Sequence, residues 1–139
     1  MKRTTTHLII LALGLLLSIP ALADRIPFAR PGDDAARIVG QPGMPSNDIY
    51  PVRFIAIDGV NLPNRGREVI WLEPGSYTLT VSAEIRNPSA RRFTRDRHET
   101  GYNTIEVVVE AGKTYHIGMK YDREQPRTPY STVLYRITE

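Results

Sequence analysis

Residues Ser76–Ile85, SYTLTVSAEI, carry the clearest structural signal in the chain. Every second position is apolar, and threonine, serine or glutamate fills the positions between. The apolar positions are Tyr77, Leu79, Val81, Ala83 and Ile85. A period of two places alternate side chains on opposite faces of a β-strand. This segment therefore predicts a strand with one face in a core and the other in water.

Five further stretches have strand-like composition and are bounded by turn residues such as Asp58-Gly59. They span residues 51–58, 67–72, 103–110, 113–121 and 131–138. In the last two, the predicted core positions are Tyr115, Ile117, Met119 and Tyr121, and then Val133, Tyr135 and Ile137. No segment of useful length has a helical period. Strands with a single apolar face are buried when two sheets face each other, so we predict an all-β protein, an antiparallel β-sandwich of about six to seven strands. A barrel is the alternative.

The N-terminus predicts an export signal. Lys2 and Arg3 precede the apolar run Leu8–Leu17, and Ala21–Ala23 forms an A-x-A cleavage site. The run is shorter than the ~20 residues that a membrane-spanning helix needs, so we expect no membrane span after cleavage. The chain has no cysteine, which excludes disulfides and a lipid-modified cysteine. The predicted location is the periplasm, with secretion beyond it as the alternative.

The sequence divides into three parts. Residues 1–23 are the predicted signal peptide. Residues 24–49 are rich in proline and glycine, and only Ala36–Val39 has the composition of a short strand, so we expect an extended arm or linker. Residues 50–139 hold the predicted strands and form the predicted sandwich domain.

The charge of the chain is close to balanced. The formal net charge is +3, and without Lys2 and Arg3 the count is 16 basic against 15 acidic residues. A general nucleic-acid binder normally has a strong basic excess, so we expect no nucleic-acid partner.

Three stretches resemble a known group of small β-sandwiches. They are Ile55–Gly59 (IAIDG), Trp71–Val81 (WLEPGSYTLTV) and Val109–Gly118 (VEAGKTYHIG). Their order resembles that of PEGA-like and carboxypeptidase-regulatory-like domains, and that of short exported proteins of proteobacteria. The resemblance implies a prealbumin-like sandwich that serves in attachment or spacing, without catalytic residues. The arginine-rich segment after residue 85 departs from this group.

That arginine-rich segment is the predicted binding site. It contains five arginines and one aromatic residue, opposed only by Asp96. The candidate residues are Arg86, Arg91, Arg92, Phe93, Arg95 and Arg97. Guanidinium groups bind phosphate and carboxylate oxygens through two parallel hydrogen bonds. The expected partner is an anionic envelope polymer, such as lipopolysaccharide or an acidic polysaccharide, or an acidic protein. The alternative is a solvated loop that keeps the protein soluble.

The two histidines after the signal peptide are the other candidates for chemistry. His98 lies between Asp96 and Glu99, but ligands this close in sequence do not converge easily on one ion, and Arg97 would repel a cation. We therefore expect no metal and no cofactor. His116 is predicted on the outward face of its strand. No serine has a recognisable nucleophile motif.

These observations predict a non-catalytic periplasmic binding or structural module. Two alternatives remain open. One is an envelope hydrolase that uses His116 or His98 with carboxylates. The other is an accessory subunit that adds a strand to the sheet of another protein. The oligomeric state and the ligand do not follow from the sequence.

Overall fold

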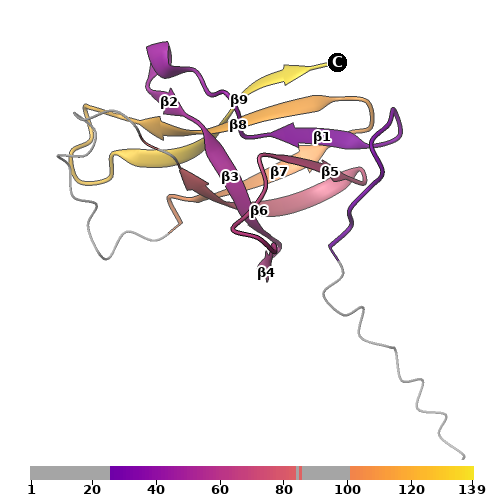
Figure 1. Ribbon diagram of the computed structural model, residues 1–139. Helices are drawn as coiled ribbons and strands as arrows, with labels where there is room; N and C mark the ends of the chain where they lie inside the picture. The colour runs from indigo at the N-terminus through magenta and orange to yellow at the C-terminus, as the bar shows by residue number, and fades with distance from the viewer. Residues whose placement is uncertain (1–25, 84, 86–100) are drawn as a thin grey trace, which may run out of the picture.

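The computed structural model describes residues 26–83, 85 and 101–139, and these form two β-sheets that face each other (Figure 1). The predicted all-β class and the sandwich are confirmed. Apart from strands, the described residues form one short 3-10 turn, Pro45–Asn47. Among the residues described, no helix has the length and apolar character needed to cross a membrane.

Sheet A is built around one central strand. Strand β8 pairs along its length with β9, antiparallel, while its other edge pairs first with β1, parallel, and then with β2, antiparallel. Strand β1 continues the sheet to β5. The strands are β1 (Ala36–Val39), β2 (Ile49–Tyr50), β5 (Val69–Leu72), β8 (Thr114–Tyr121) and β9 (Tyr130–Thr138).

Sheet B is antiparallel, in the order β4-β3-β6-β7. Its strands are β3 (Val52–Ile57), β4 (Val60–Asn61), β6 (Gly75–Ala83) and β7 (Thr104–Val109). The strongly alternating segment of the sequence forms β6, the strand that joins β3 to β7. The predicted turn at Asp58-Gly59 connects β3 to β4, and both of its residues have positive φ.

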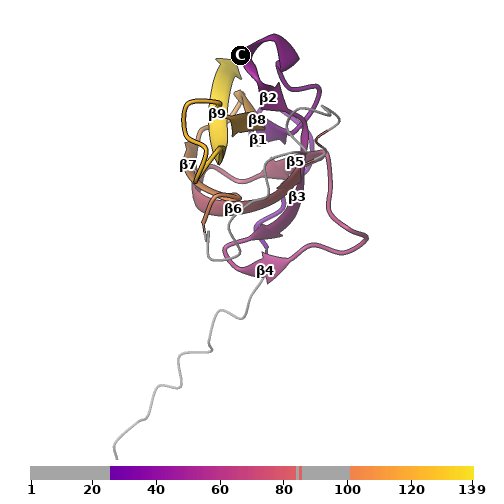
Figure 2. The same ribbon diagram turned by 90° about the vertical axis from the view of Figure 1, so that its left-hand side faces the viewer.

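The two sheets are joined by backbone hydrogen bonds on one side. The amide of Val52 donates to the carbonyl of Gly40 at 2.8 Å, and Phe54 and Arg67 exchange two bonds of 2.7 and 2.9 Å. On the other side lie the edge strands β7 and β9 (Figure 2). One backbone bond crosses there, from the Thr132 amide to the Tyr102 carbonyl at 2.9 Å.

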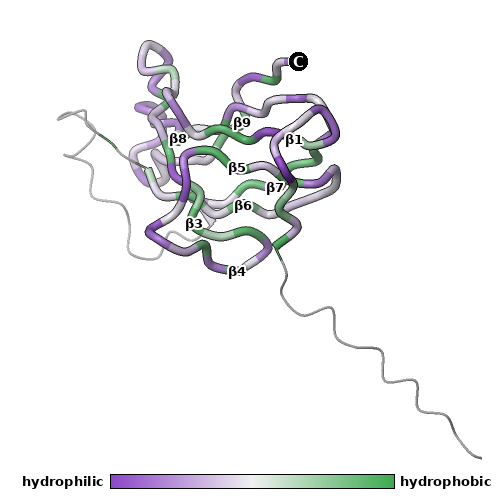
Figure 3. The backbone as a smooth tube through the Cα atoms, turned by 45° about the vertical axis from the view of Figure 1, so that its right-hand side comes forward, coloured by the Kyte–Doolittle hydropathy of each residue, from purple (hydrophilic) through white to green (hydrophobic). Residues whose placement is uncertain are grey.

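The core lies between the sheets, as the alternating pattern predicted. Figure 3 shows that hydrophobic residues gather on the strands and hydrophilic ones on the connecting turns. The predicted core side chains of β8 are at most 3% exposed. In β6, Tyr77, Leu79 and Val81 are buried, while Ala83 is half-buried at the end of the strand. Phe54 of β3 is completely buried between the layers.

Within residues 24–49, the possible short strand at Ala36–Val39 is confirmed as β1, but the expected extended arm is wrong for the part that the structure describes. Strand β1 lies inside sheet A, between β5 and β8, with Ala36 and Ile38 fully buried. Strand β2 begins at Ile49 and pairs with β8. The prolines and glycines that suggested a linker supply turns between very short strands, and short strands carry too few residues to show a period.

The predicted inward face of the last strand is also wrong. Leu134 pairs with the buried Ile117 and packs against the core, so its neighbours Val133 and Tyr135 lie on the other phase of the strand. Ile137 is 51% exposed, although it pairs with the buried Tyr115. The cause is a register shift in the pairing of β8 with β9: His116 pairs with Arg136, but Ile117 pairs with Leu134. The extra residue, Tyr135, changes which side chains face inward.

Candidate functional site

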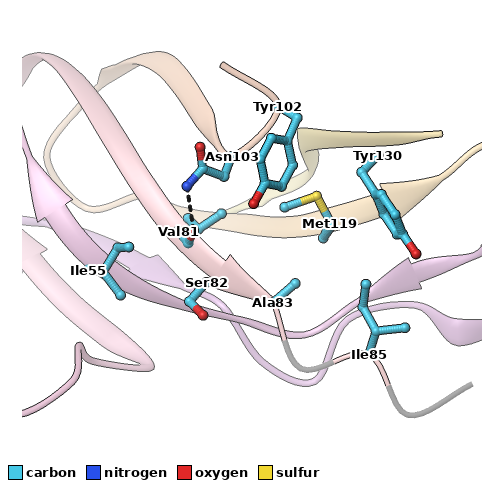
Figure 4. A pocket seen from close by; sticks show the side chains of 9 residues that line it. All are labelled: Ile55, Val81, Ser82, Ala83, Ile85, Tyr102, Asn103, Met119 and Tyr130. Carbon is cyan, nitrogen blue, oxygen red and sulfur yellow. Dashed lines mark hydrogen bonds between the residues drawn. The ribbon is translucent and has the colours of Figure 1, made fainter. Parts of the chain in front are cut away.

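A pocket opens where β6 ends and β7 is about to begin (Figure 4). We call it the end pocket; its volume is about 440 Å³. Residues from both sheets line it, because the two layers separate at this end. They are Ile55, Val81, Ser82, Ala83, Ile85, Tyr102, Asn103, Met119 and Tyr130.

The lining of the end pocket is mixed. Aliphatic side chains and the thioether of Met119 form its apolar part, while Ser82, Asn103 and two tyrosines supply polar groups. The amide of Asn103 donates to the Val81 carbonyl at 3.2 Å, which fixes its orientation (Figure 4). None of the lining residues carries a charge at neutral pH. A pocket with apolar walls and a few placed polar groups is suited to binding an apolar group, and its described lining residues include no acid–base pair.

The predicted binding residues from Arg86 to Arg97, Phe93 included, lie outside the residues that the structure describes, as does His98. The covalent chain nevertheless ties this segment to the end pocket. Ile85 lines the pocket and directly precedes Arg86, and the described chain resumes at Gly101, next to the lining residue Tyr102. The segment is therefore connected to the pocket directly at Ile85, and through residues 98–101 at Tyr102.

His116 lies on the outer face of sheet A, as predicted, in a cationic environment. Arg136 Nη2 donates to His116 Nδ1 at 3.3 Å, and His116 Nε2 lies 3.3 Å from the Thr138 hydroxyl. A guanidinium only donates, so the imidazole is neutral, with its proton on Nε2. Partial burial and then the charges of Arg136 and Arg37 lower the pKa of His116. No carboxylate among the described residues orients this imidazole, so the geometry gives it no partner for hydrolysis.

The other side chains around His116 were not predicted from the sequence. Arg37 of β1 stacks over Trp71 of β5, with its guanidinium carbon 6.0 Å from the ring centroid. Trp71 sits on the outward phase of its strand, next to the inward Ile70 and Leu72. Trp71 is the only tryptophan of the chain, and the alternation of its strand places it on the outer face, so the sequence itself marks it as a candidate contact residue.

Within the described ranges, no group of three or more histidine, cysteine, aspartate or glutamate side chains is arranged to hold a metal ion. The fold and the site thus define a small β-sandwich with an apolar pocket at one end and a cationic outer face on one sheet. No family model, curated protein or solved structure matches the chain.

Proposed function

We propose that this protein is a non-catalytic binding module of the bacterial cell envelope, exported to the periplasm. Its arginine-rich segment binds the anionic groups of an envelope component, and the end pocket takes an apolar part of the same molecule. The observation that carries the proposal is the position of Ile85 and Tyr102, which line the pocket and flank the segment. The resemblance to PEGA-like domains, which implies an attachment role, agrees with it.

The arginine-rich segment and the end pocket together favour one kind of ligand. Guanidinium groups recognise phosphate or carboxylate oxygens, while an uncharged apolar pocket offers an anion no attraction of its own. A molecule with both acyl chains and phosphates uses both surfaces. Among the expected partners, lipopolysaccharide has this chemistry, whereas an acidic polysaccharide or an acidic protein would use the arginines alone.

The arginine contribution is tested by the triple substitution Arg91→Ala, Arg92→Ala and Arg95→Ala. We expect affinity for lipopolysaccharide to fall by about tenfold or more, since each charge-assisted hydrogen bond contributes more than a neutral one. The loss should shrink as salt is added, because salt screens exposed charges. Equilibrium binding to immobilised lipopolysaccharide at two salt concentrations measures both effects.

The matched control removes three exposed arginines elsewhere: Arg30, Arg65 and Arg127. It changes the net charge by the same amount and should leave binding nearly unchanged. An equal loss in both triple variants would mean that net charge alone drives retention. A separate substitution, Ala83→Phe, fills the end pocket and should weaken binding to lipopolysaccharide but not to a phosphorylated sugar without acyl chains.

A second candidate function, strand addition, is favoured by the edge of β7 that no described strand covers. The Val81 amide donates to the Asn103 carbonyl, and in an antiparallel pair such bonds recur at every second residue. The backbone groups of Glu106 and Val108 therefore point away from β6, and no described strand pairs with them. Val108 is 71% exposed, and β7 has no lysine, proline or bulge that would block pairing.

We expect a photoreactive residue at position 108 to crosslink to a partner strand in the envelope, if strand addition operates. The same residue at Val69, an exposed position on the outer face of sheet A, is the control. The substitution Val108→Lys should abolish association with the partner strand and change the free energy of unfolding by no more than about 0.5 kcal/mol, as is usual for a surface site. Equal crosslinking at both positions would remove the support for this function.

A further inference from the structure

The outer face of sheet A carries cations that have no carboxylate partner among the described residues. Arg37, His116 and Arg136 lie on three neighbouring strands, β1, β8 and β9, and Trp71 extends the row to β5. We call these four residues the cationic platform. The ion pairs between described residues lie elsewhere and join Arg53 to Glu68, Lys113 to Glu110 and Arg123 to Asp48.

The groups of the platform are held in place by each other. The Arg37 guanidinium stacks on Trp71, and the Arg136 guanidinium donates to the neutral imidazole of His116. Both arginines lie near enough to His116 to lower its pKa. A guanidinium that is fixed by stacking or by a neutral acceptor keeps its full charge and further donors for a ligand. The platform is therefore ordered and positive before any ligand binds.

A shallow hollow of about 120 Å³ beside Trp71 adds groups of a different kind. Its lining includes Arg37, Trp71, Lys113, Thr114 and Asp33, so basic, acidic and hydroxyl residues lie together with an aromatic ring. An acidic sugar suits this mixture. Its carboxylate binds a cation, its hydroxyls donate to a carboxylate and accept from threonine and arginine, and its apolar ring face packs on an aromatic ring.

The shape of this surface points to an extended ligand. The platform crosses four strands, which at a spacing of ~4.8 Å corresponds to about 14 Å from β5 to β9. Arg37 and Arg136 are exposed, and the hollow is too small to enclose a whole ligand. Two arginines at this separation are too few for a nucleic-acid duplex, which needs many phosphate contacts.

We propose that the cationic platform is a second binding site, which takes a linear acidic polysaccharide through its carboxylate groups, with Arg37 and Arg136 binding carboxylates and Trp71 supporting a sugar ring. This site is independent of the arginine-rich segment and of the end pocket. Asp33 accepts hydroxyl hydrogen bonds at one end of the platform. His116 holds Arg136 in position and is a positioning residue.

The test uses the full mature chain and a trisaccharide of galacturonic acid as the probe. Trp71 is the only tryptophan, so its fluorescence reports binding at this site alone. We expect a saturable fluorescence change, and a loss of affinity of about tenfold in Arg37→Ala, since a charge-assisted bond is lost. Arg37→Lys should also bind weakly, because an ammonium cannot form the two parallel bonds.

The controls separate this site from net charge and from the proposed function. Arg127→Ala removes one exposed arginine from the connection before β9 and should bind as the unmodified protein does. The Arg91, Arg92 and Arg95 triple variant should also bind normally, even if it fails to bind lipopolysaccharide. The methyl ester of the probe, which has no carboxylates, should not bind. Equal losses in Arg37→Ala and Arg127→Ala, or no change in Trp71 fluorescence, would overturn the proposal.

A pH series adds a readout that a merely structural role would not change. The groups that face His116 are Arg37 of β1 and Arg136, Thr138 and Tyr135 of β9. Partial burial and the charges of Arg136 and Arg37 lower the pKa of His116, so its ring gains a proton only in more acidic solution. A protonated imidazole cannot accept from Arg136, so acidification should release this guanidinium and weaken binding of the probe. His116→Gln, whose amide does not gain a proton, should show a flatter pH profile. The same slope in His116→Gln would exclude this role.

Discussion

Replacing Gly40 with alanine is expected to lower the free energy of unfolding by about 3 kcal/mol. Gly40 is buried directly after β1, where sheet A approaches the first residue of β3 in sheet B. Its carbonyl accepts from the Val52 amide and its amide donates to the Glu68 carbonyl, both at 2.8 Å. A Cβ at this position would lie well inside van der Waals contact with the Val52 carbonyl oxygen. Because the obstacle is hydrogen-bonded backbone, the methyl group can be accepted only by moving β3 away from sheet A.

Equilibrium unfolding in urea measures this loss, and Gly32→Ala is its matched control. A Cβ added at Gly32 would meet no atom within 4 Å, and the backbone there has an ordinary conformation. Alanine at this position should leave stability unchanged or raise it by about 0.5 kcal/mol, through the entropy of the unfolded chain. Identical urea midpoints for Gly40→Ala and Gly32→Ala would contradict the close approach of the two sheets at Gly40.

Replacing Phe54 with alanine is expected to cost about 4 kcal/mol of unfolding free energy. The ring is 0% exposed and is among the largest fully buried side chains of the described residues. Its truncation removes apolar burial and leaves a cavity that two hydrogen-bonded sheets cannot easily close. Thermal or urea unfolding of the variant measures the cost.

Two companion substitutions keep the Phe54 prediction testable if the alanine variant fails to fold. Phe54→Leu conserves most of the apolar volume and should cost about 1.5 kcal/mol. Val108→Ala removes an apolar side chain that is 71% exposed and should change stability by less than about 0.5 kcal/mol. A Phe54→Leu variant as stable as the unmodified protein would show that this ring does not fill the core tightly.

The long strands could be predicted from the sequence because their alternation is a local property. The strand predicted at residues 76–85 corresponds to β6, which spans Gly75–Ala83. The strand predicted at residues 113–121 corresponds to β8, which spans Thr114–Tyr121. Short strands carry a weaker signal. Composition marked Ala36–Val39 as a short strand, but not its place between β5 and β8. Strand β2 has two residues and is defined by its pairing with β8, more than 60 residues further along the chain. The bulge at Tyr135 likewise depends on the partner strand.

The candidate sites likewise divide into those that a local sequence pattern reveals and those that depend on the packing of distant strands. Composition alone singled out the arginine-rich segment, which remains a prediction because it lies outside the described residues. The end pocket combines positions as distant as Ile55, Ala83 and Tyr130, which only the packing of the two sheets brings together. The cationic platform depends on the register that places Arg37 opposite Trp71 and His116 opposite Arg136. No pattern in the sequence marks these residues as a group until the pairing of their strands is known.

The parallel pairing of β1 with β8 determines when the molecule can fold. Strand β1 is near the start of the described chain, but one of its two neighbours ends only at Tyr121. A growing polypeptide that lacks residues 114–121 leaves one edge of β1 without its neighbour, and sheet A has no central strand. Contacts between such distant segments make folding slow. The chain should thus stay unfolded until its synthesis is almost complete.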